Sequence, residues 1–253
     1  MMTLVFPDLH EPPAATLAAI DRIIEREAPD RVVLLGDYFD ARDDTPADAA
    51  RTARWLKTSL ADPRRVHLIG NHDASYLWPC EATLCPGFSW EKEEEIRRVL
   101  GPDAARPFVF HAWVDGWLMT HAGLSAHWVP AGLHPDVLDR WLAAEAQKAR
   151  ASFASDKAHW FASVGHKRGG PSSAGGILWC DLREFRAVPG VRQVFGHSPA
   201  KQPRWIGKGQ LCLDTNLGSG PQHYAILKAG AIEVCMFSRR KLASSRAIDA
   251  LFS

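Results

Sequence analysis

The stretch Val32–Asp40 constrains the fold of this chain more than any other. It begins with the apolar run Val32-Val33-Leu34-Leu35 and reaches Gly36, a pattern typical of a buried parallel strand. The carboxylates of Asp37 and Asp40 follow. Chemistry in an open α/β sheet collects just beyond the carboxyl ends of parallel strands, so Asp37 is a candidate site residue. One carboxylate at a strand end is common, so the case for Asp37 depends on how many other strands also end in polar side chains.

The composition excludes several classes of protein. With 253 residues the chain is long enough for one large α/β domain, and we expect a single domain over 1–253. A net charge of +1 gives no bias toward nucleic acid or membrane surfaces. No apolar stretch approaches the ~20 residues of a membrane helix, and the first residues lack the pattern of a signal peptide. The 5 cysteines, an odd number without framework spacing, favour free thiols and a cytoplasmic location over a disulfide or zinc site at Cys80 and Cys85.

The first strand also ends in polar groups. Leu4-Val5-Phe6 is followed by Asp8 and His10, whose side chains are two apart and can face the same way. A helix is expected from about Pro13, with an apolar stripe formed by Leu17, Ile20, Ile23 and Ile24. Because the strand at Arg31 comes next, this is a βαβ unit whose two strands should be parallel and adjacent.

A third strand repeats the arrangement. Thr45 has the features of an N-cap and Pro46 those of a first helical residue, and this helix should run to about Leu60. The strand expected over 65–69 then ends in Gly70-Asn71-His72-Asp73. Asn71 and His72 therefore follow the third strand as Asp8 and Asp37 follow the first two.

Two further strands end in histidine. The strand over 117–120 leads to His121-Ala122-Gly123, and the strand over 193–195 leads to Gly196-His197. A helix over 134–151 lies between them, with apolar residues at helical spacing. Five strand ends thus carry groups able to bind a metal.

Irregular segments and a tail complete the pattern. We expect residues 74–100 to be a loop insertion that ends in a charged helix over 91–100, and such loops often cover a site. The glycine-rich stretch 165–176 lacks the order of a P-loop, so a plain flexible loop is favoured over a phosphate-gripping one. Residues 210–216 and 224–237 fit strands of an antiparallel edge, with a hairpin turn at Ala229-Gly230. A solvated helix face is expected near the end at Arg239, Arg240, Lys241 and Arg246.

Together the strand ends carry seven side chains of metal-ligand type, Asp8, His10, Asp37, Asn71, His72, His121 and His197. Carboxylate, imidazole and amide oxygen together suit manganese, iron or zinc better than a thiolate site would. Each residue alone would more often be structural. Their repetition at equivalent positions predicts a metal centre.

The motifs resemble those of the calcineurin-like metallophosphoesterase superfamily. Its signature is D-x-H, G-D-x-x-D, G-N-H-D/E, H-A/G-G and G-H, and all five occur here in that order between residues 8 and 198. The later stretch Leu213-Asp214-Thr215-Asn216 is similar to bacterial phosphoprotein phosphatases and symmetrical diadenosine tetraphosphatases, and Trp179 points more weakly to the same branch.

This resemblance implies an αββα sandwich, with two mixed β-sheets flanked by helices, around two divalent transition-metal ions. Manganese is the first choice for these ions, with iron, zinc, cobalt or nickel as alternatives. Asp8 and His10 would hold one ion, Asn71, His121 and His197 the other, and Asp37 would bridge them. A hydroxide shared by the ions would attack phosphorus.

The resemblance also implies roles for the remaining motif residues. His72 would protonate the leaving oxygen, and Asp40 would orient His72 and keep it protonated. In the protein-phosphatase branch an arginine that grips phosphate follows the carboxylate matched by Asp40, but here Ala41 stands there. Arg42, Arg183 and Arg168 are the candidates to replace it.

Other departures from the signature affect substrate choice. Pro7 and Glu11 stand where glycines usually flank the first motif. The diesterase-like branches end in G-H-x-H, whereas the second histidine is replaced here by Pro199, which offers no donor. The first metal would then have a more open coordination sphere.

Three functions compete at this stage. The leading hypothesis is a metal-dependent phosphatase acting on a phosphoprotein or a small phosphomonoester. The second is a dinucleoside polyphosphate hydrolase, which would use the same centre on an anhydride. A non-catalytic scaffold is disfavoured because every ligand and the acid histidine are present.

Overall fold

Two five-stranded mixed β-sheets form the centre of the molecule. The computed structural model describes residues 1–10, 14–218 and 220–237. The first sheet has the order β10-β9-β1-β2-β3, and its strands are β1 (Met2–Phe6), β2 (Arg31–Leu34), β3 (Arg65–His67), β9 (His223–Lys228) and β10 (Ala231–Met236). β1, β2 and β3 are parallel, while β9 runs antiparallel to both β1 and β10. The expected βαβ unit and the hairpin turn at Ala229-Gly230 are confirmed.

The second sheet has the order β4-β5-β6-β8-β7. Its strands are β4 (His111–Val114), β5 (Trp117–Thr120), β6 (Arg192–Phe195), β7 (Arg204–Ile206) and β8 (Gln210–Cys212). β5, β6 and β8 are parallel neighbours, and β4 and β7 form the antiparallel edges. Because β5 and β6 point the same way, the residues that follow them emerge at one end of the sheet.

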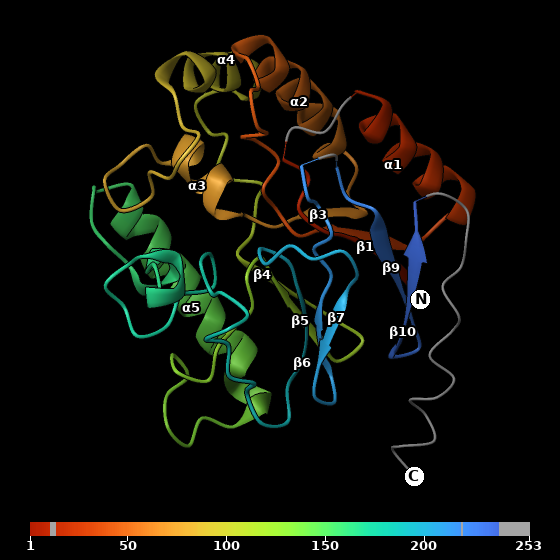
Figure 1. Cartoon of the computed structure of the whole chain (residues 1–253), viewed down its shortest axis with the longest axis vertical. Coiled ribbons are helices and arrows are strands. Elements are labelled where there is room, and N and C mark those ends of the chain that lie inside the picture. Colours follow the sequence, from red (N-terminus) through yellow and green to blue (C-terminus); the bar gives the residue numbers. More distant parts are fainter. Residues whose placement is uncertain (11–13, 219, 238–253) are drawn as a thin grey trace.

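Helices cover the outer faces of the sheets (Figure 1). They are α1 (Ala14–Glu27), α2 (Pro46–Ser59), α3 (Asn71–Leu77), α4 (Trp90–Leu100) and α5 (Pro135–Phe153), with short 3₁₀ turns η1 (Trp160–Ala162) and η2 (His166–Arg168). The α1 stripe Leu17, Ile20, Ile23 and Ile24 is buried, as the spacing predicted. Thr45 caps α2 through a capping box with Asp48, and Pro46 is its first residue.

Alternation along the strands divides the core into two parts. On β1, Leu4 and Phe6 join the large apolar cluster that includes the buried residues of α1. Val5 points the other way and joins a cluster with Val33 of β2 and Val194 of β6. Because that second cluster draws on both sheets, it lies between them. The αββα sandwich expected from the sequence is confirmed.

Several expected element boundaries were wrong. Helix α3 covers 71–77, whereas a loop insertion was expected from residue 74. β3 ends at His67, and Leu68 forms only an isolated bridge with Val109. β8 was assigned to an antiparallel edge but lies inside the second sheet, parallel to β6, because Leu211 and Leu213 are needed in the core between the sheets. The basic cluster near the end falls outside the described residues.

Two compositional expectations can be checked in the described part of the chain. Its helices include none that is both long and apolar enough to cross a membrane. In the described residues the 5 cysteines form no disulfide.

We expect acid to destabilise the fold through His67. Its ring is buried, with Nε2 3.0 Å from Ser59 Oγ and Nδ1 3.2 Å from the Tyr38 hydroxyl. Burial, with the charge of Arg65, lowers the pKa of His67 to about 3 from the ordinary 6.5. The unfolded state therefore binds one more proton between these values. The contribution of His67 to the free energy of unfolding is fully present above pH 6.5. It decreases as the pH falls toward 3, by at most about 5 kcal/mol.

The measurement is urea unfolding of wild type and His67→Gln between pH 7 and pH 4. The variant should take up about one proton fewer on unfolding than the wild type. Its free energy of unfolding should therefore depend less steeply on pH. The exposed His134, changed to Gln, is the matched control. An unchanged slope in His67→Gln would contradict the expectation.

Candidate metal centre

The loops that follow β1, β2, β3, β5 and β6 meet at one end of the sandwich. The backbone N–H groups of Leu9 and His10 both donate to the Asp37 carbonyl, at 3.0 and 2.6 Å, so the first two loops are joined directly. The loops after β1 and β6 are also joined, because the His197 N–H donates to Asp8 Oδ2 at 2.8 Å. Gly196 permits this contact, since a Cβ there would lie 1.8 Å from Asp8 Oδ1.

Four of the candidate residues have left-handed backbone conformations. The φ angles of His10, Asp37, Asp40 and His197 are 47°, 51°, 65° and 67°. Such conformations cost free energy for a non-glycine residue and are enriched at functional sites. These turns bring the side chains toward one another.

Asp73 holds the second and third loops together. Its Oδ2 accepts from the N–H groups of Asp37 and Gly70, at 2.7 and 2.8 Å, and its Oδ1 accepts from the Tyr38 N–H at 2.8 Å. Asp73 stands in the third motif of the sequence, where no role was predicted for it. Its side chain fixes the turn from which Asp37 projects.

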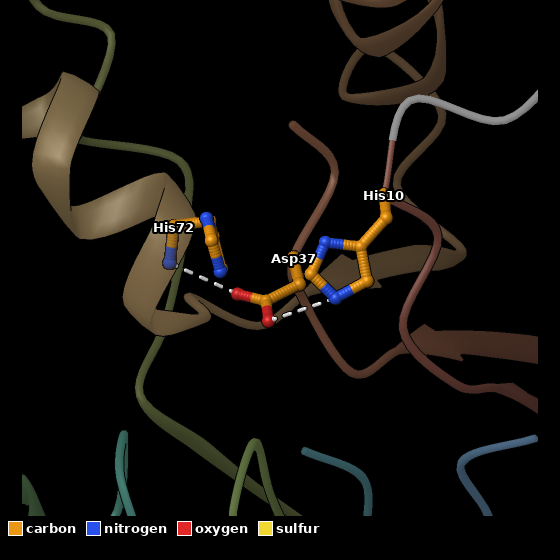
Figure 2. A group of neighbouring side chains, drawn as sticks. All are labelled: His10, Asp37 and His72. Atoms are coloured by element: carbon orange, nitrogen blue, oxygen red, sulfur yellow. Dashed lines mark hydrogen bonds and ion pairs between the residues drawn. The ribbon is translucent and has the colours of Figure 1, made fainter. Parts of the chain in front are cut away.

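Asp37 lies between two groups of potential ligands. On one side, its Oδ2 lies 3.5 Å from His10 Nε2, while its Oδ1 accepts from the His72 N–H at 3.0 Å (Figure 2). On the other side, the same Oδ2 lies 3.3 Å from His121 Nε2. The potential ligand atoms of His10, Asp37 and His72 all lie within 4.8 Å of one another, as do those of Asp37, His121 and His197.

His121 is at the centre of the second group. Its Nδ1 donates to the Leu35 carbonyl at 2.9 Å, which leaves Nε2 with a lone pair in the neutral ring. That Nε2 lies 3.1 Å from Asn71 Oδ1 and 3.2 Å from His197 Nδ1, besides its contact with Asp37. The atoms gathered around Nε2 form a candidate cation site.

Two unpartnered buried atoms lie at the same place. Among the buried side-chain atoms that lack a hydrogen-bond partner in the described residues are Asp8 Oδ1 and His197 Nε2. Buried polar atoms are normally paired, so these two are candidate ligand positions. The residues therefore fit a site for divalent transition metals, although Asp8 lies beside the two groups and belongs to neither.

The charges in the centre shift its pKa values strongly. Burial opposes the charged form of His121, but the Asp37 and Asp8 carboxylates raise its pKa to about 9. Burial likewise opposes ionisation of Asp37, yet His121 and His72 hold the pKa of its carboxyl well below the ordinary range. The centre thus favours an ionised Asp37 carboxylate beside positively charged groups.

His72 and Asp40 form a pair at the open side of the centre. His72 Nδ1 lies 2.8 Å from Asp40 Oδ2, and its ring meets that of His10 edge-on with centroids 5.0 Å apart. The His72 side chain is 18% exposed and that of Asp40 only 1%. Burial works against the imidazolium, but the charge of Asp37 and the hydrogen bond with Asp40 raise the pKa of His72 well above its ordinary value.

The three candidate arginines lie in different places. Arg168, in η2, bonds Asp181 Oδ2 at 2.8 Å and donates to the His197 carbonyl at 2.7 Å, so it reaches the centre. Arg183 donates to both oxygens of Asp181, at 2.8 and 3.1 Å, but its side chain is 65% exposed. Arg42 is exposed, and no hydrogen bond or ion pair joins it to the centre within the described residues.

Three further residues around the centre were not predicted from the sequence to belong to it. Asp214 follows β8, and burial raises its pKa to about 7. Lys92 Nζ lies 2.6 Å from Asp40 Oδ1, and the Tyr76 hydroxyl donates to the same oxygen. Asp214 had a signal, because it too follows a strand end, but nothing in the sequence connects Lys92 with Asp40.

Comparisons with solved structures show the fold. A cold-active protein-tyrosine phosphatase of the psychrophile Shewanella sp. aligns with a TM-score of 0.63 at 14% identity, covering 95% of this chain and 79% of that one. Another structure of a cold-active protein tyrosine phosphatase aligns with a TM-score of 0.63 at 13% identity, with coverages of 95% and 78%. A putative diadenosine tetraphosphatase gives a TM-score of 0.46 at 15% identity and covers 93% of each chain.

The sequence itself identifies the family. No curated protein matches this chain. The model of the family described as calcineurin-like phosphoesterase matches residues 1–201, most of the chain. That range contains all the strand-end motifs, from Asp8 to His197. The chain therefore belongs to the calcineurin-like phosphoesterases, a family of hydrolases that act on phosphoric esters.

Proposed function

We propose that this protein is a metal-dependent phosphatase that hydrolyses phosphomonoesters, on a phosphoprotein or a small molecule, in the cytoplasm. The observation that carries the proposal is the buried Asp37 carboxylate between His10 and His121, with the His72–Asp40 pair beside it. Two divalent ions, with manganese the first choice, would be held by Asp8, His10, Asp37, Asn71, His121 and His197. When bound, they supply an activated water and positive charge for the phosphoryl oxygens.

The protein's own groups complete the chemistry. His72 Nδ1 is engaged by Asp40, which leaves Nε2 as the nitrogen that can give a proton to the leaving oxygen. Asp40 holds the ring in that orientation. Arg168 is the arginine best placed to attract phosphate, since it contacts the His197 backbone and retains 28% exposure.

A dinucleoside polyphosphate hydrolase is the second candidate. The half-buried Trp179 favours it, because its ring meets His197 edge-on at 5.5 Å between centroids and could stack on a nucleobase at the centre. The tail stretch Leu213–Asn216 resembles the same branch.

We expect monoesters to be preferred over diesters. The Ser198 hydroxyl accepts from the Leu182 N–H at 3.1 Å, and Pro199 is exposed and carries no donor. Neither side chain therefore adds a metal ligand after His197. A cationic site with open positions attracts the dianion of a phosphomonoester more strongly than a singly charged diester.

The test compares nitrophenyl phosphate with bis-nitrophenyl phosphate, using manganese-loaded protein at one pH. A higher kcat/KM for the monoester supports the proposal, and a higher value for the diester contradicts it. Symmetrical cleavage of diadenosine tetraphosphate, more efficient than that of either ester, would select the second candidate.

A further inference from the structure

The Asp40 carboxylate is held by three donors from outside its own loop. Its Oδ2 faces His72 Nδ1 at 2.8 Å. Its Oδ1 accepts from Lys92 Nζ at 2.6 Å and from the Tyr76 hydroxyl. The two oxygens therefore have separate partners, and only Oδ2 is left for the histidine.

Lys92 is a buried lysine between two carboxylates. Its side chain is 6% exposed, and besides Asp40 it bonds both carboxylate oxygens of Asp44 at 3.1 Å. Burial opposes its charge, but the hydrogen bonds with Asp40 and Asp44 raise the pKa of Lys92 above its ordinary value. Removing Lys92 would leave the buried carboxylates of Asp40 and Asp44 without its positive charge. Lys92 therefore stabilises both carboxylates in their positions.

The segment between α3 and α4 closes around the same carboxylate. Gly87 lies directly against Asp40, since a Cβ there would be 2.8 Å from the Cβ of Asp40. Cys85 Sγ lies 3.5 Å from His72 Nδ1. The insertion over 74–100 thus provides a buried enclosure for the Asp40–His72 pair.

We propose that Lys92, assisted by Tyr76, is a positioning residue for the proton donor. By occupying Oδ1, the two side chains fix the rotation of the Asp40 carboxylate, so that Oδ2 aims at His72 Nδ1. The inference rests on the proposed function, in which His72 gives a proton to the leaving group. It assigns to the 74–100 insertion the task of orienting that donor.

The first experiment is Lys92→Met in manganese-loaded protein. A misaligned donor should slow alkyl phosphates, whose leaving groups need a proton, by about tenfold in kcat. Nitrophenyl phosphate, which has a good leaving group, should lose less than about threefold. KM should stay the same for both, because Lys92 contacts neither the candidate ligands nor Arg168 in the described structure.

Three further variants separate positioning from general damage. Lys57→Met is the matched control, because Lys57 also bonds α4, through the Val99 carbonyl at 2.9 Å, without a hydrogen bond to Asp40. It should leave both substrates unchanged. Lys92→Arg should recover most of the alkyl phosphate rate. Tyr76→Phe, which keeps Lys92, should reproduce the selective loss on a smaller scale and carries the test if Lys92→Met does not fold.

A measurement independent of turnover completes the test. In metal-free protein, the His72 Nδ1 proton should be protected from exchange with water in NMR spectra, and Lys92→Met or Tyr76→Phe should remove this protection.

Losses of turnover that are equal for alkyl and nitrophenyl phosphates, together with unchanged proton protection, would overturn the inference. If His72→Asn shows the selective loss and the Lys92 and Tyr76 variants do not, only this inference is wrong. Absence of any phosphatase activity in wild type would instead contradict the proposed function, and the NMR result would still decide the positioning role.

Discussion

Asp37→Asn is expected to abolish most metal binding and to lower turnover by at least about 10³-fold. Asp37 is the side chain that the two groups of potential ligands share, at 3.5 Å from His10 Nε2 and 3.3 Å from His121 Nε2. Asparagine keeps the shape and can still accept from the His72 N–H, but it removes the negative charge that attracts cations into a buried site.

Elemental analysis of purified protein is the measurement. Wild type should contain up to two transition-metal ions per chain, and the variant clearly fewer. Asp43→Asn is the matched control, since Asp43 is exposed, lies in the loop after Asp40 and also has a positive φ, of 63°. Two tightly bound ions in Asp37→Asn, or metal located away from the six proposed ligands by anomalous scattering, would contradict the assignment.

His72→Asn is expected to keep its metal and lose about 10²–10⁴-fold in turnover, the usual contribution of a general acid. The ring is held by Asp40 through Nδ1 and is partly exposed at the open side of the centre, so its loss removes a proton donor rather than a structural contact. Asp40→Asn should show a smaller defect of the same kind, because the donor remains but is no longer oriented by a charge.

The leaving group distinguishes this role from others. The loss should be large for alkyl phosphates and shrink for nitrophenyl phosphate, which departs without a proton. His134→Asn is the control, because His134 caps α5 at the surface and asparagine is an equally good cap. Equal losses for both substrates would mean that His72 has another role.

The sequence predicted the part of the centre that local patterns determine. Buried strands appear in the sequence as short apolar runs. Five candidate residues follow such runs closely: Asp8, Asp37, Asn71, His121 and His197. Because parallel strands end at the same edge of a sheet, these residues were expected to meet at one end of the sandwich. The α1 stripe is equally local, since its spacing alone fixes which residues are buried.

Contacts between distant segments could not be predicted in this way. Lys92 and Asp40 are 52 positions apart, and a lysine in a charged helix gives no sign that it will be buried. β8 looked like an edge strand because its parallel neighbour β6 becomes apparent only once the second sheet is assembled. The choice among Arg42, Arg168 and Arg183 depends on how η2 folds against Asp181, which no local pattern encodes.

The candidate ligands come from both sheets. Asp8, His10, Asp37 and Asn71 follow strands of the first sheet, whereas His121 and His197 follow strands of the second. A cation bound by both sets would act as a cross-link between the two halves of the sandwich, much as a disulfide joins distant segments. Ions that bind only the native state add to its stability according to their free concentration, so the thermal stability of this protein would follow the supply of metal in its surroundings.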